Sequence, residues 1–308
     1  MAVTRRPVIL AYLCLGIGVL SVAFSAIFVR WADAPGTVSS FYRTAIAALL
    51  LAGPFWWRAS RRGRVSRLGL RVAILGGVIF AGDLALWATG VVLSGATNPT
   101  LLANTAPVWV GLGSLIFFHE RLNTRFWVGL LLALGGAILI LGLDALRMAA
   151  FGLGTLLGLL AAIFYGGYFL VTQRGRQRLD SLTYSWITTL SASLALLALC
   201  LALGQPLTGY PTLTYLCFLA LGVVVQVVGW VAINYAQGYL PASVVAPTML
   251  SQSVVTAVLA ALLLGEELSG WQILAGVAVL AGIYLVHRSR AKDPDSRRQA
   301  ELGLADAG

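Results

Sequence analysis

The sequence is short of charge. Only 10% of its 308 residues are charged, whereas 59% are hydrophobic. Soluble domains usually carry about 25% charged residues, so this chain lacks the polar surface that water needs to solvate it. Its apolar residues form long runs, and several approach the ~20 residues that a helix needs to cross ~30 Å of hydrocarbon. The shortage of charge therefore excludes an ordinary soluble domain and favours a chain embedded in lipid.

The sequence also lacks the motifs of nucleotide, metal and nucleophilic chemistry. It has no glycine-rich loop followed by lysine, which argues against ATP hydrolysis. Its two histidines, His119 and His287, lie at the ends of apolar runs, and its three cysteines (Cys14, Cys200 and Cys217) lie inside such runs without metal-ligand or redox spacing. We therefore expect no cofactor, no metal ion and no enzymatic activity. The net charge of +10 does not predict nucleic-acid binding, because the arginines gather at the ends of apolar runs.

Ten apolar runs are present, separated by turn residues such as Ala34-Pro35-Gly36 and Leu240-Pro241. Because lipid offers the backbone no hydrogen-bond partners, each run is expected to be a helix. The first run, Val8–Val29, exceeds the ~7–15 residues of a signal-peptide core and is interpreted as an uncleaved helix. The predicted helices are 8–29, 35–57, 68–92, 97–118, 126–144, 151–172, 181–204, 212–236, 242–264 and 270–287.

The distribution of cations predicts the topology. With the N-terminus in the cytoplasm, eighteen lysine and arginine residues fall on the cytoplasmic side and only Arg30 and Arg147 fall outside. Cytoplasmic segments of membrane proteins carry this excess of cations. Residues 1–7 and the tail 288–308 are therefore both placed in the cytoplasm, and the chain is predicted to be a multi-pass protein of a bacterial inner membrane.

An internal repeat relates the two halves of the chain. Shifting the second half back by 146 positions superimposes Glu266 on Glu120, and it also aligns leucines two residues later and glycines sixteen residues later. Each unit, 8–144 and 151–287, contains five helices, so the second must enter the membrane from the opposite face. The fold class is therefore all-α integral membrane, with ten transmembrane helices as two inverted five-helix repeats, an arrangement typical of transporters.

These residues resemble the ten-helix, EamA-type members of the drug/metabolite transporter superfamily. The resemblance covers residues 8–287 and rests on two strings, His119-Glu120-Arg121-Leu122 and Gly265-Glu266-Glu267-Leu268, together with Pro107 and Arg43. The second half departs from the pattern, because Ser253 stands where the equivalent proline is expected.

Within that family the chain is most similar to the YddG-type aromatic amino-acid exporters. The resemblance implies export of amino acids and related metabolites by alternating access. It also implies a central cavity between the first, third, fourth, sixth, eighth and ninth helices, with the fifth and tenth as scaffold.

Two ionisable residues, Arg43 and Asp83, are predicted to lie at similar depth inside the second and third helices. A charge in hydrocarbon is costly unless it is paired or wetted. Three interpretations are open: an ion pair that joins the two helices, an Asp83 carboxylate that faces the cavity and binds an amino group or a proton, or two groups that are bonded separately.

Neutral polar and aromatic residues near mid-membrane are the candidate cavity lining. Amides can bind the carboxylate and amino groups of a zwitterion while rings cover its side chain, although buried amides also join helices. Prolines within the fourth and ninth helices are candidate bending points, because proline removes a backbone donor. The candidate lining is Trp87, Asn104, Tyr165, Tyr168, Gln226, Trp230, Asn234 and Gln252, and the bending points are Pro99, Pro107 and Pro247.

Three functions follow from these patterns. The first is a monomeric exporter of amino acids, particularly aromatic ones, that works within the lipid bilayer and binds no nucleic acid. The second is a transporter of another small metabolite, an organic cation or a drug. The third, from a different class, is a membrane-embedded enzyme or lipid-handling protein, which the lack of a nucleophile or metal cluster disfavours.

Overall fold

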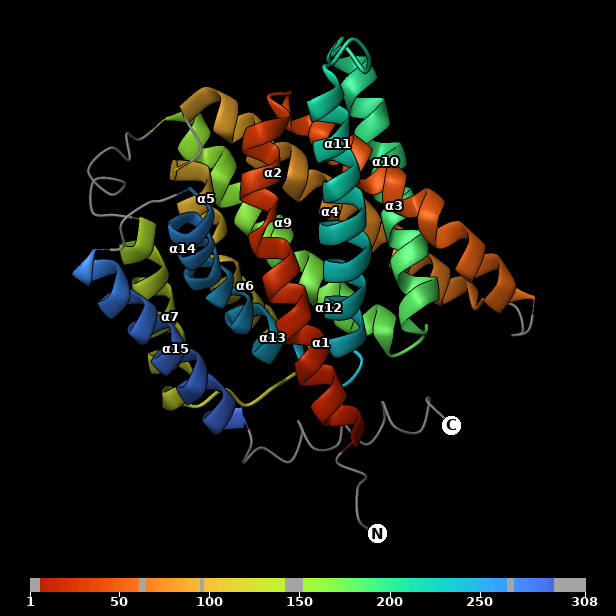
Figure 1. Ribbon diagram of the computed structural model, residues 1–308. Helices are drawn as coiled ribbons and strands as arrows, with labels where there is room; N and C mark the ends of the chain where they lie inside the picture. The colour runs from red at the N-terminus through yellow and green to blue at the C-terminus, as the bar shows by residue number, and fades with distance from the viewer. Residues whose placement is uncertain (1–5, 61–64, 95–96, 142–151, 265–268, 291–308) are drawn as a thin grey trace.

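The computed structural model describes residues 6–60, 65–94, 97–141, 152–264 and 269–290 (Figure 1). In these ranges the chain forms helices and turns only. Eight helical segments are long and apolar enough to span a membrane, and two shorter apolar helices cover residues 101–117 and 124–140. These segments correspond to the ten predicted spans and confirm the all-α membrane fold of two inverted five-helix repeats.

The first half of the described chain consists of α1 (Arg6–Ala23), α2 (Ser25–Ala32), α3 (Gly36–Ala59), α4 (Arg67–Ser94), α5 (Thr97–Ala103), α6 (Ala106–Phe117) and α7 (Thr124–Leu141). The second half consists of α9 (Leu153–Arg176), α10 (Ser181–Ala202), α11 (Thr212–Ala220), η1 (Leu221–Trp230), α12 (Val231–Ala236), α13 (Ala242–Met249), α14 (Ser251–Leu264) and α15 (Gly270–Arg290).

The helix ends form two faces of different charge. One of them, the basic face, holds the start of α1, the ends of α3, α9 and α15, and the starts of α4 and α10, in the lower part of Figure 1. Cations near helix C-termini are favoured by the helix dipole, and both α9 and α15 carry arginines in their last turn. The described arginines of the basic face are Arg58, Arg67, Arg71, Arg121, Arg125, Arg174, Arg176, Arg178, Arg288 and Arg290.

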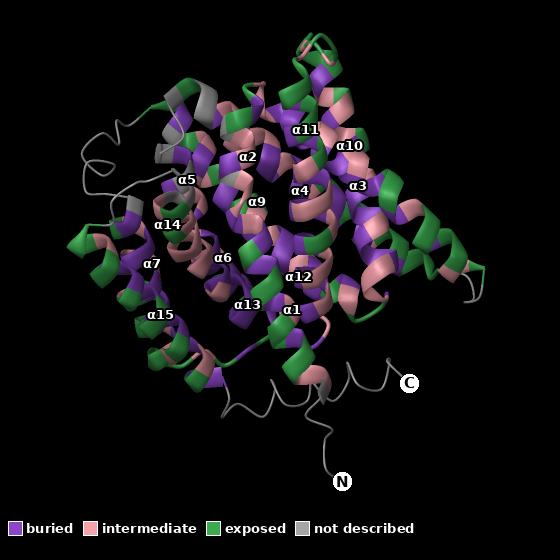
Figure 2. Cartoon of the chain, in the orientation of Figure 1, coloured by how far each residue is buried: buried purple, intermediate pink, exposed green. Residues whose placement is uncertain are grey.

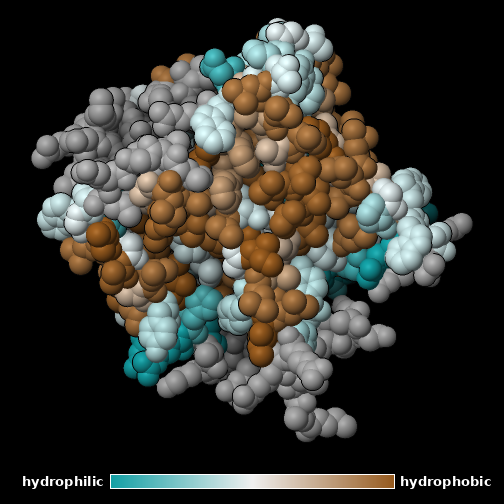
Figure 3. Space-filling view, in the orientation of Figure 1, coloured by the Kyte–Doolittle hydropathy of each residue, from teal (hydrophilic) through white to brown (hydrophobic). Residues whose placement is uncertain are grey.

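Large apolar side chains cover the outside of the bundle between these two faces. Leu49, Ile116 and Leu131 are 77%, 66% and 61% exposed. Figure 2 shows exposed residues along the outer helices, and Figure 3 shows a broad hydrophobic surface with hydrophilic residues mainly at its margins. Such a surface requires lipid around it.

The predicted helix 8–29 divides into α1 and α2 at Phe24, and two further predicted helices are broken at positions that are equivalent in the two repeats. The expected helix 97–118 divides into α5 and α6 at Asn104, and the expected helix 242–264 divides into α13 and α14 at Leu250. The two positions differ by 146, the offset of the sequence repeat. Tight turns replace α-helical bonds there, with Thr105 N donating to Leu102 O at 2.9 Å and Leu250 N donating to Pro247 O at 3.1 Å.

The candidate bending prolines stand close to these breaks. Pro107 occupies the first turn of α6, where a missing backbone donor costs nothing. Pro247 lies inside α13, three residues before its break. Pro99 lies in the first turn of α5 and packs against the backbone of α9 at Gly158.

The eighth predicted helix, 212–236, contains a ten-residue π-helical segment, η1, between α11 and α12. A π-helix has one more residue per hydrogen-bonded turn than an α-helix, and it commonly occurs at functional sites. Both Gln226 and Trp230 belong to this segment. The apolar pattern of residues 212–236 predicts a regular helix here, so the π-helical segment corrects that prediction.

Helices α7 and α15 pack against each other through small residues at one side of the bundle (Figure 1). A Cβ atom on Gly136 would lie 2.6 Å from the carbonyl oxygen of Ala275 and 2.8 Å from the amide nitrogen of Val279. A Cβ atom on the neighbouring Gly135 would meet no atom within 4 Å. Only one glycine of this pair is therefore needed for the close contact.

Gly136→Ala is expected to destabilise the protein by about 1–3 kcal/mol, the usual cost of overpacking, because the new methyl group meets the backbone of α15. Gly135→Ala is the matched control and is expected to be neutral or slightly stabilising, since alanine favours helix. Thermal unfolding in detergent measures both. Equal melting temperatures for the two variants would contradict the close contact.

Candidate functional site

Five aromatic side chains from three elements meet in the interior of the bundle. This aromatic cluster consists of Phe80 on α4, Tyr165, Tyr168 and Phe169 on α9, and Trp230 on η1. The Phe80 ring lies 4.6 Å from the Tyr168 ring and 4.9 Å from the Trp230 ring, measured between centroids. The Tyr165 and Trp230 centroids are 6.0 Å apart. These distances are typical of favourable aromatic pairs.

The cluster contains one ring that remains partly accessible. Phe80, Tyr168, Phe169 and Trp230 are each at most 3% exposed, whereas Tyr165 is half-buried although its neighbours are not. Tyr165 is therefore the ring of the cluster that a ligand can reach most readily. Trp230 contributes a further feature, because its indole Nε1 is buried and has no hydrogen-bond partner among the described residues. Buried donors are normally paired, so this group is suited to a ligand or a water molecule.

The buried cation Arg43 lies beside the cluster. Its Nε donates a hydrogen bond to Oε1 of Gln226 at 2.7 Å, and its guanidinium carbon lies 5.8 Å from the centre of the Phe80 ring. Arg43 is only 7% exposed and Gln226 is 3% exposed. The amide oxygen and the ring face both stabilise the cation without neutralising it. The site therefore keeps a positive charge inside the membrane.

Asp83 follows Phe80 by three residues on α4 and is 7% exposed. It lies close enough to Arg43 for electrostatic interaction. Among the described residues, however, the two form no ion pair within 4 Å, because the Arg43 Nε is directed to Gln226 on η1. Arg43 on α3 and Asp83 on α4, which were predicted to lie at similar depth, are thus near each other but are not joined by the direct ion pair that one interpretation expected.

Asn234 joins three helices. Its Oδ1 accepts from the hydroxyl of Tyr168 at 3.2 Å, and its Nδ2 donates to the hydroxyl of Ser185 at 3.0 Å. Its backbone oxygen accepts from the Nε of Arg176 at 2.8 Å. Both ends of the amide thus bind protein groups, which orients the Tyr168 ring within the cluster.

The other predicted lining residues lie further from the Arg43 site. Asn104 is buried at the break between α5 and α6, and Gln252 is half-buried in the first turn of α14. Neither shares a hydrogen bond with the cluster in the described part of the chain. Trp87 is half-buried one turn beyond Asp83 on α4. Sequence reasoning missed Phe80 and Phe169, because a phenylalanine in an apolar run carries no sign of the direction it faces.

Comparison with known proteins decides the family. The model of the EamA-like transporter family matches residues 9–142 and again 152–288, which is most of the chain. The protein belongs to the EamA-like transporter family. It is therefore a multi-pass membrane transporter of the drug/metabolite transporter superfamily, as the sequence resemblance implied.

Similar proteins support the same assignment. An "Uncharacterized transporter" of Archaeoglobus fulgidus is 28% identical over 254 residues, which are 80% of this chain and 86% of that protein. The "Uncharacterized transporter YdfC" of Bacillus subtilis is 23% identical over 192 residues, 60% of each chain. A solved structure, "Crystal structure of protein", shares the fold with a TM-score of 0.75 at 18% identity, and the match covers 90% of this chain and 96% of that one.

The repeated glutamate of this EamA-like transporter forms a second buried site, at the basic face. Oε2 of Glu120 accepts from Nη2 of Arg290 at 2.7 Å and from the hydroxyl of Ser243 at 2.6 Å. Its Oε1 accepts from Nε2 of Gln173 at 3.5 Å, and Oε1 of Gln173 accepts from the amide nitrogen of Ala242 at 2.6 Å. We name Glu120, Gln173, Ser243 and Arg290 the Glu120 lock.

The Glu120 lock joins the two halves of the transporter. Glu120 follows α6 in the first half, whereas its three partners lie at the end of α9, the start of α13 and the end of α15 in the second half. The side chains of Glu120 and Arg290 are only 5% and 4% exposed. The recurrence of this glutamate in the two halves of the sequence indicates a fixed role, and the lock gives Glu120 a structural one. Its repeat equivalent, Glu266, lies outside the described residues.

Proposed function

We propose that this EamA-like transporter exports amino acids with aromatic or other hydrophobic side chains, and related metabolites, from the bacterial cytoplasm by alternating access. The observation that carries the proposal is the Arg43 guanidinium, which is buried between Gln226 and Phe80 at the edge of the aromatic cluster.

The charged groups suit the two ends of a zwitterion. A guanidinium binds a carboxylate through two parallel hydrogen bonds. In the described part of the chain only Nε of Arg43 donates a hydrogen bond, to Gln226, so its terminal nitrogens are suited to a substrate carboxylate. The carboxylate of Asp83, on the same helix face as Phe80, supplies the opposite charge for an ammonium group.

The aromatic cluster suits the side chain of such a substrate. Tyr165, the ring with an accessible side, can cover an apolar or aromatic group by stacking. The unpartnered Nε1 of Trp230 adds a hydrogen-bond donor for a polar atom of the substrate. Because Gln226 and Trp230 share η1, a change in this π-helical segment moves the amide that bonds Arg43 and the Trp230 indole together.

The charge of the two faces supports an orientation. We place the basic face in the cytoplasm of a bacterial inner membrane, with both termini on that side, because cytoplasmic segments carry the cations. The units 8–144 and 151–287 then rock against each other, with bends at the equivalent breaks near Pro107 and Pro247. One chain supplies every group of the site, so a monomer is sufficient.

A second candidate function is transport of organic cations. The buried Asp83 carboxylate beside aromatic rings is an arrangement that binds ammonium groups by charge and by cation–π contact. Under this alternative the Arg43 cation would serve to hold Asp83 in its charged form, and a substrate carboxylate would be unnecessary.

Three related compounds separate the two functions in proteoliposomes. Labelled tryptophan carries both charges, tryptamine lacks the carboxylate, and indole-3-propionate lacks the ammonium group. We expect saturable tryptophan flux that excess phenylalanine inhibits and that neither analogue inhibits at equal concentration, because the site binds both charges at once. Liposomes without protein provide the background.

Each outcome is decisive. Tryptamine flux without tryptophan flux supports the organic-cation function, and indole-3-propionate flux removes the role of Asp83 as ammonium ligand. No saturable flux of any amino acid in a panel of the twenty overturns the proposed function.

A further inference from the structure

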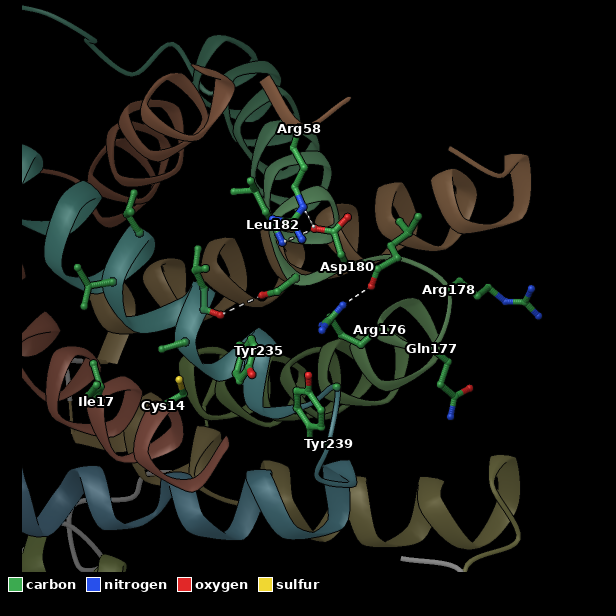
Figure 4. Close-up of a pocket in the computed structure, with 17 residues that line it drawn as sticks. Cys14, Ile17, Arg58, Arg176, Gln177, Arg178, Asp180, Leu182, Tyr235 and Tyr239 are labelled. Atoms are coloured by element: carbon green, nitrogen blue, oxygen red, sulfur yellow. Dashed lines mark hydrogen bonds and ion pairs between the residues drawn. The ribbon is translucent and has the colours of Figure 1, made fainter. Parts of the chain in front are cut away.

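A groove opens at the basic face, and Figure 4 shows the residues that line it. It has a volume of about 910 Å³ and lies between α1, the start of α10 and the segment from η1 to α12. It is separate from the Arg43 site and from the Glu120 lock, and neither contributes a residue to it.

The end of the groove at the basic face is positively charged. Among the described residues, three arginines, Arg58, Arg176 and Arg178, border it together with one carboxylate, that of Asp180. Asp180 also caps α10, accepting from the hydroxyl of Thr183 at 2.8 Å and from the amide nitrogen of Leu182 at 3.2 Å. The groove therefore has a surplus of two positive charges.

The arginines differ in how they are used. Arg176 donates to the backbone oxygens of Asn234 and Leu179 and serves to hold the helix ends. Arg58 forms an ion pair with Asp180, its Nε 3.5 Å from Oδ1, and this Nε makes no hydrogen bond within the described residues. Arg178 is exposed, and Figure 4 shows its side chain directed away from the bundle. Arg58 and Arg178 can thus both reach an anion at the mouth of the groove.

The end of the groove away from the basic face is apolar and exposed. Ile17 on α1 is 49% exposed and Val228 on η1 is 45% exposed. Val228 lies eight residues before the end of α12, about 12 Å deeper at ~1.5 Å per residue. One leaflet of hydrocarbon is about 15 Å thick. The apolar wall therefore has nearly the length of a lipid chain in that leaflet.

Two tyrosines mark the level between these ends. Tyr235 and Tyr239 border the groove with their ring centroids 5.1 Å apart. Tyrosines concentrate where lipid headgroups meet hydrocarbon. Cationic, tyrosine and apolar zones follow one another in the order of the headgroup, glycerol and acyl regions of a phospholipid.

We propose that this groove binds one anionic diacyl phospholipid, with its phosphate between Arg58 and Arg178 and one acyl chain along Ile17 and Val228. Basic pockets between transmembrane helices bind anionic headgroups in this way. The lipid contacts α1 of the first repeat and α10 and α12 of the second. The proposal requires only that the chain spans a membrane, and it is independent of the transported substrate.

Native mass spectrometry of the purified protein tests it, with phosphatidylglycerol and phosphatidylcholine added at equal concentration. We expect one phosphatidylglycerol to be retained preferentially, and Arg58→Gln and Arg178→Gln each to weaken retention about fivefold, the usual effect of one arginine near an anionic headgroup. Arg125→Gln, which removes an exposed arginine of the basic face outside the groove, is the control and is expected to retain the lipid.

Two further measurements with the same assay identify the ligand. Phosphatidylglycerol with six-carbon chains is expected to bind more weakly than the long-chain lipid, and glycerol phosphate is expected not to displace it, because the apolar wall contributes to binding. Displacement by glycerol phosphate would instead indicate a site for soluble anions and overturn the proposal. Equal retention in the Arg58→Gln/Arg178→Gln double variant, with an unchanged melting temperature, would also overturn it.

Discussion

Arg43→Gln is expected to weaken binding of a zwitterionic substrate roughly 30- to 900-fold, because loss of one partner from a buried charged contact costs about 2–4 kcal/mol. The variant removes the only described cation beside the aromatic cluster. Gln226 then faces a neutral amide in place of the guanidinium. Concentration-dependent tryptophan flux in proteoliposomes measures the change as a rise in the apparent KM.

Gln226→Glu tests the same contact without removing Arg43. The new carboxylate has nearly the shape of the amide, so it keeps the hydrogen bond to Nε while neutralising the guanidinium. We expect tryptophan flux to fall as strongly as in Arg43→Gln, while the melting temperature stays at or above that of the wild type, because the buried cation gains a partner.

A control separates this result from a general effect of charge. Arg71→Gln removes an exposed arginine of α4 at the basic face and is expected to leave the apparent KM unchanged. If Gln226→Glu transported tryptophan like the wild type, the guanidinium would not bind the substrate carboxylate. If it lost tryptophan flux but gained tryptamine flux, the site would prefer cations once the arginine is neutralised.

Most of the fold could be predicted from sequence because lipid imposes a simple rule. A run of apolar residues must satisfy its own backbone, so length and composition locate the helices. The sequence repeat also predicted how the two halves are related, since Glu120 and Glu266 occupy equivalent positions in them. The offset of the repeat also relates the breaks at Asn104 and Leu250, although each break was expected only as a weakened helix.

The internal details could not be predicted, for identifiable reasons. A π-helical segment differs from an α-helix by one residue per turn, and nothing in the composition of residues 221–230 distinguishes the two. Which side chains meet depends on how each helix is rotated about its own axis. The depth of a residue along its helix does not give that rotation. Arg43 and Asp83 were correctly placed inside helices, but the partner that Arg43 bonds, Gln226, lies 183 residues away.

The Glu120 lock illustrates the same limit. Recurrence marked Glu120 as a residue with a fixed role, whereas its ion-pair partner Arg290 lies 170 residues away. Arg290 was predicted to lie in the cytoplasmic tail that begins at 288, but the first residues of that tail continue α15. Only the packing of α9, α13 and α15 against the end of α6 brings these groups to one place. The contact matters for mechanism because any rocking of the two halves that opens the basic face must break it.

Glu120→Gln is expected to open the basic face. Loss of one partner of a buried ion pair costs about 3–5 kcal/mol, and here the cost falls on the conformation in which the lock is closed. We expect a cysteine introduced at Ala246, a buried residue about one turn beyond Ser243, to react with a membrane-impermeant thiol reagent at least about tenfold faster in this variant, as a shift of that size in the conformational equilibrium requires. The experiment uses a chain whose native cysteines are replaced by alanine.

The double variant Glu120→Gln/Arg290→Gln distinguishes a gate from a simple loss of stability. Two amides can bond each other without leaving a buried charge, so the double variant is expected to recover much of the melting temperature that the single variant loses. Its labelling at Ala246→Cys is expected to remain faster than in the wild-type background, because an amide pair holds the halves together less strongly than an ion pair. Unchanged labelling in both variants would show that the halves separate elsewhere, and that the Glu120 lock is part of the static scaffold.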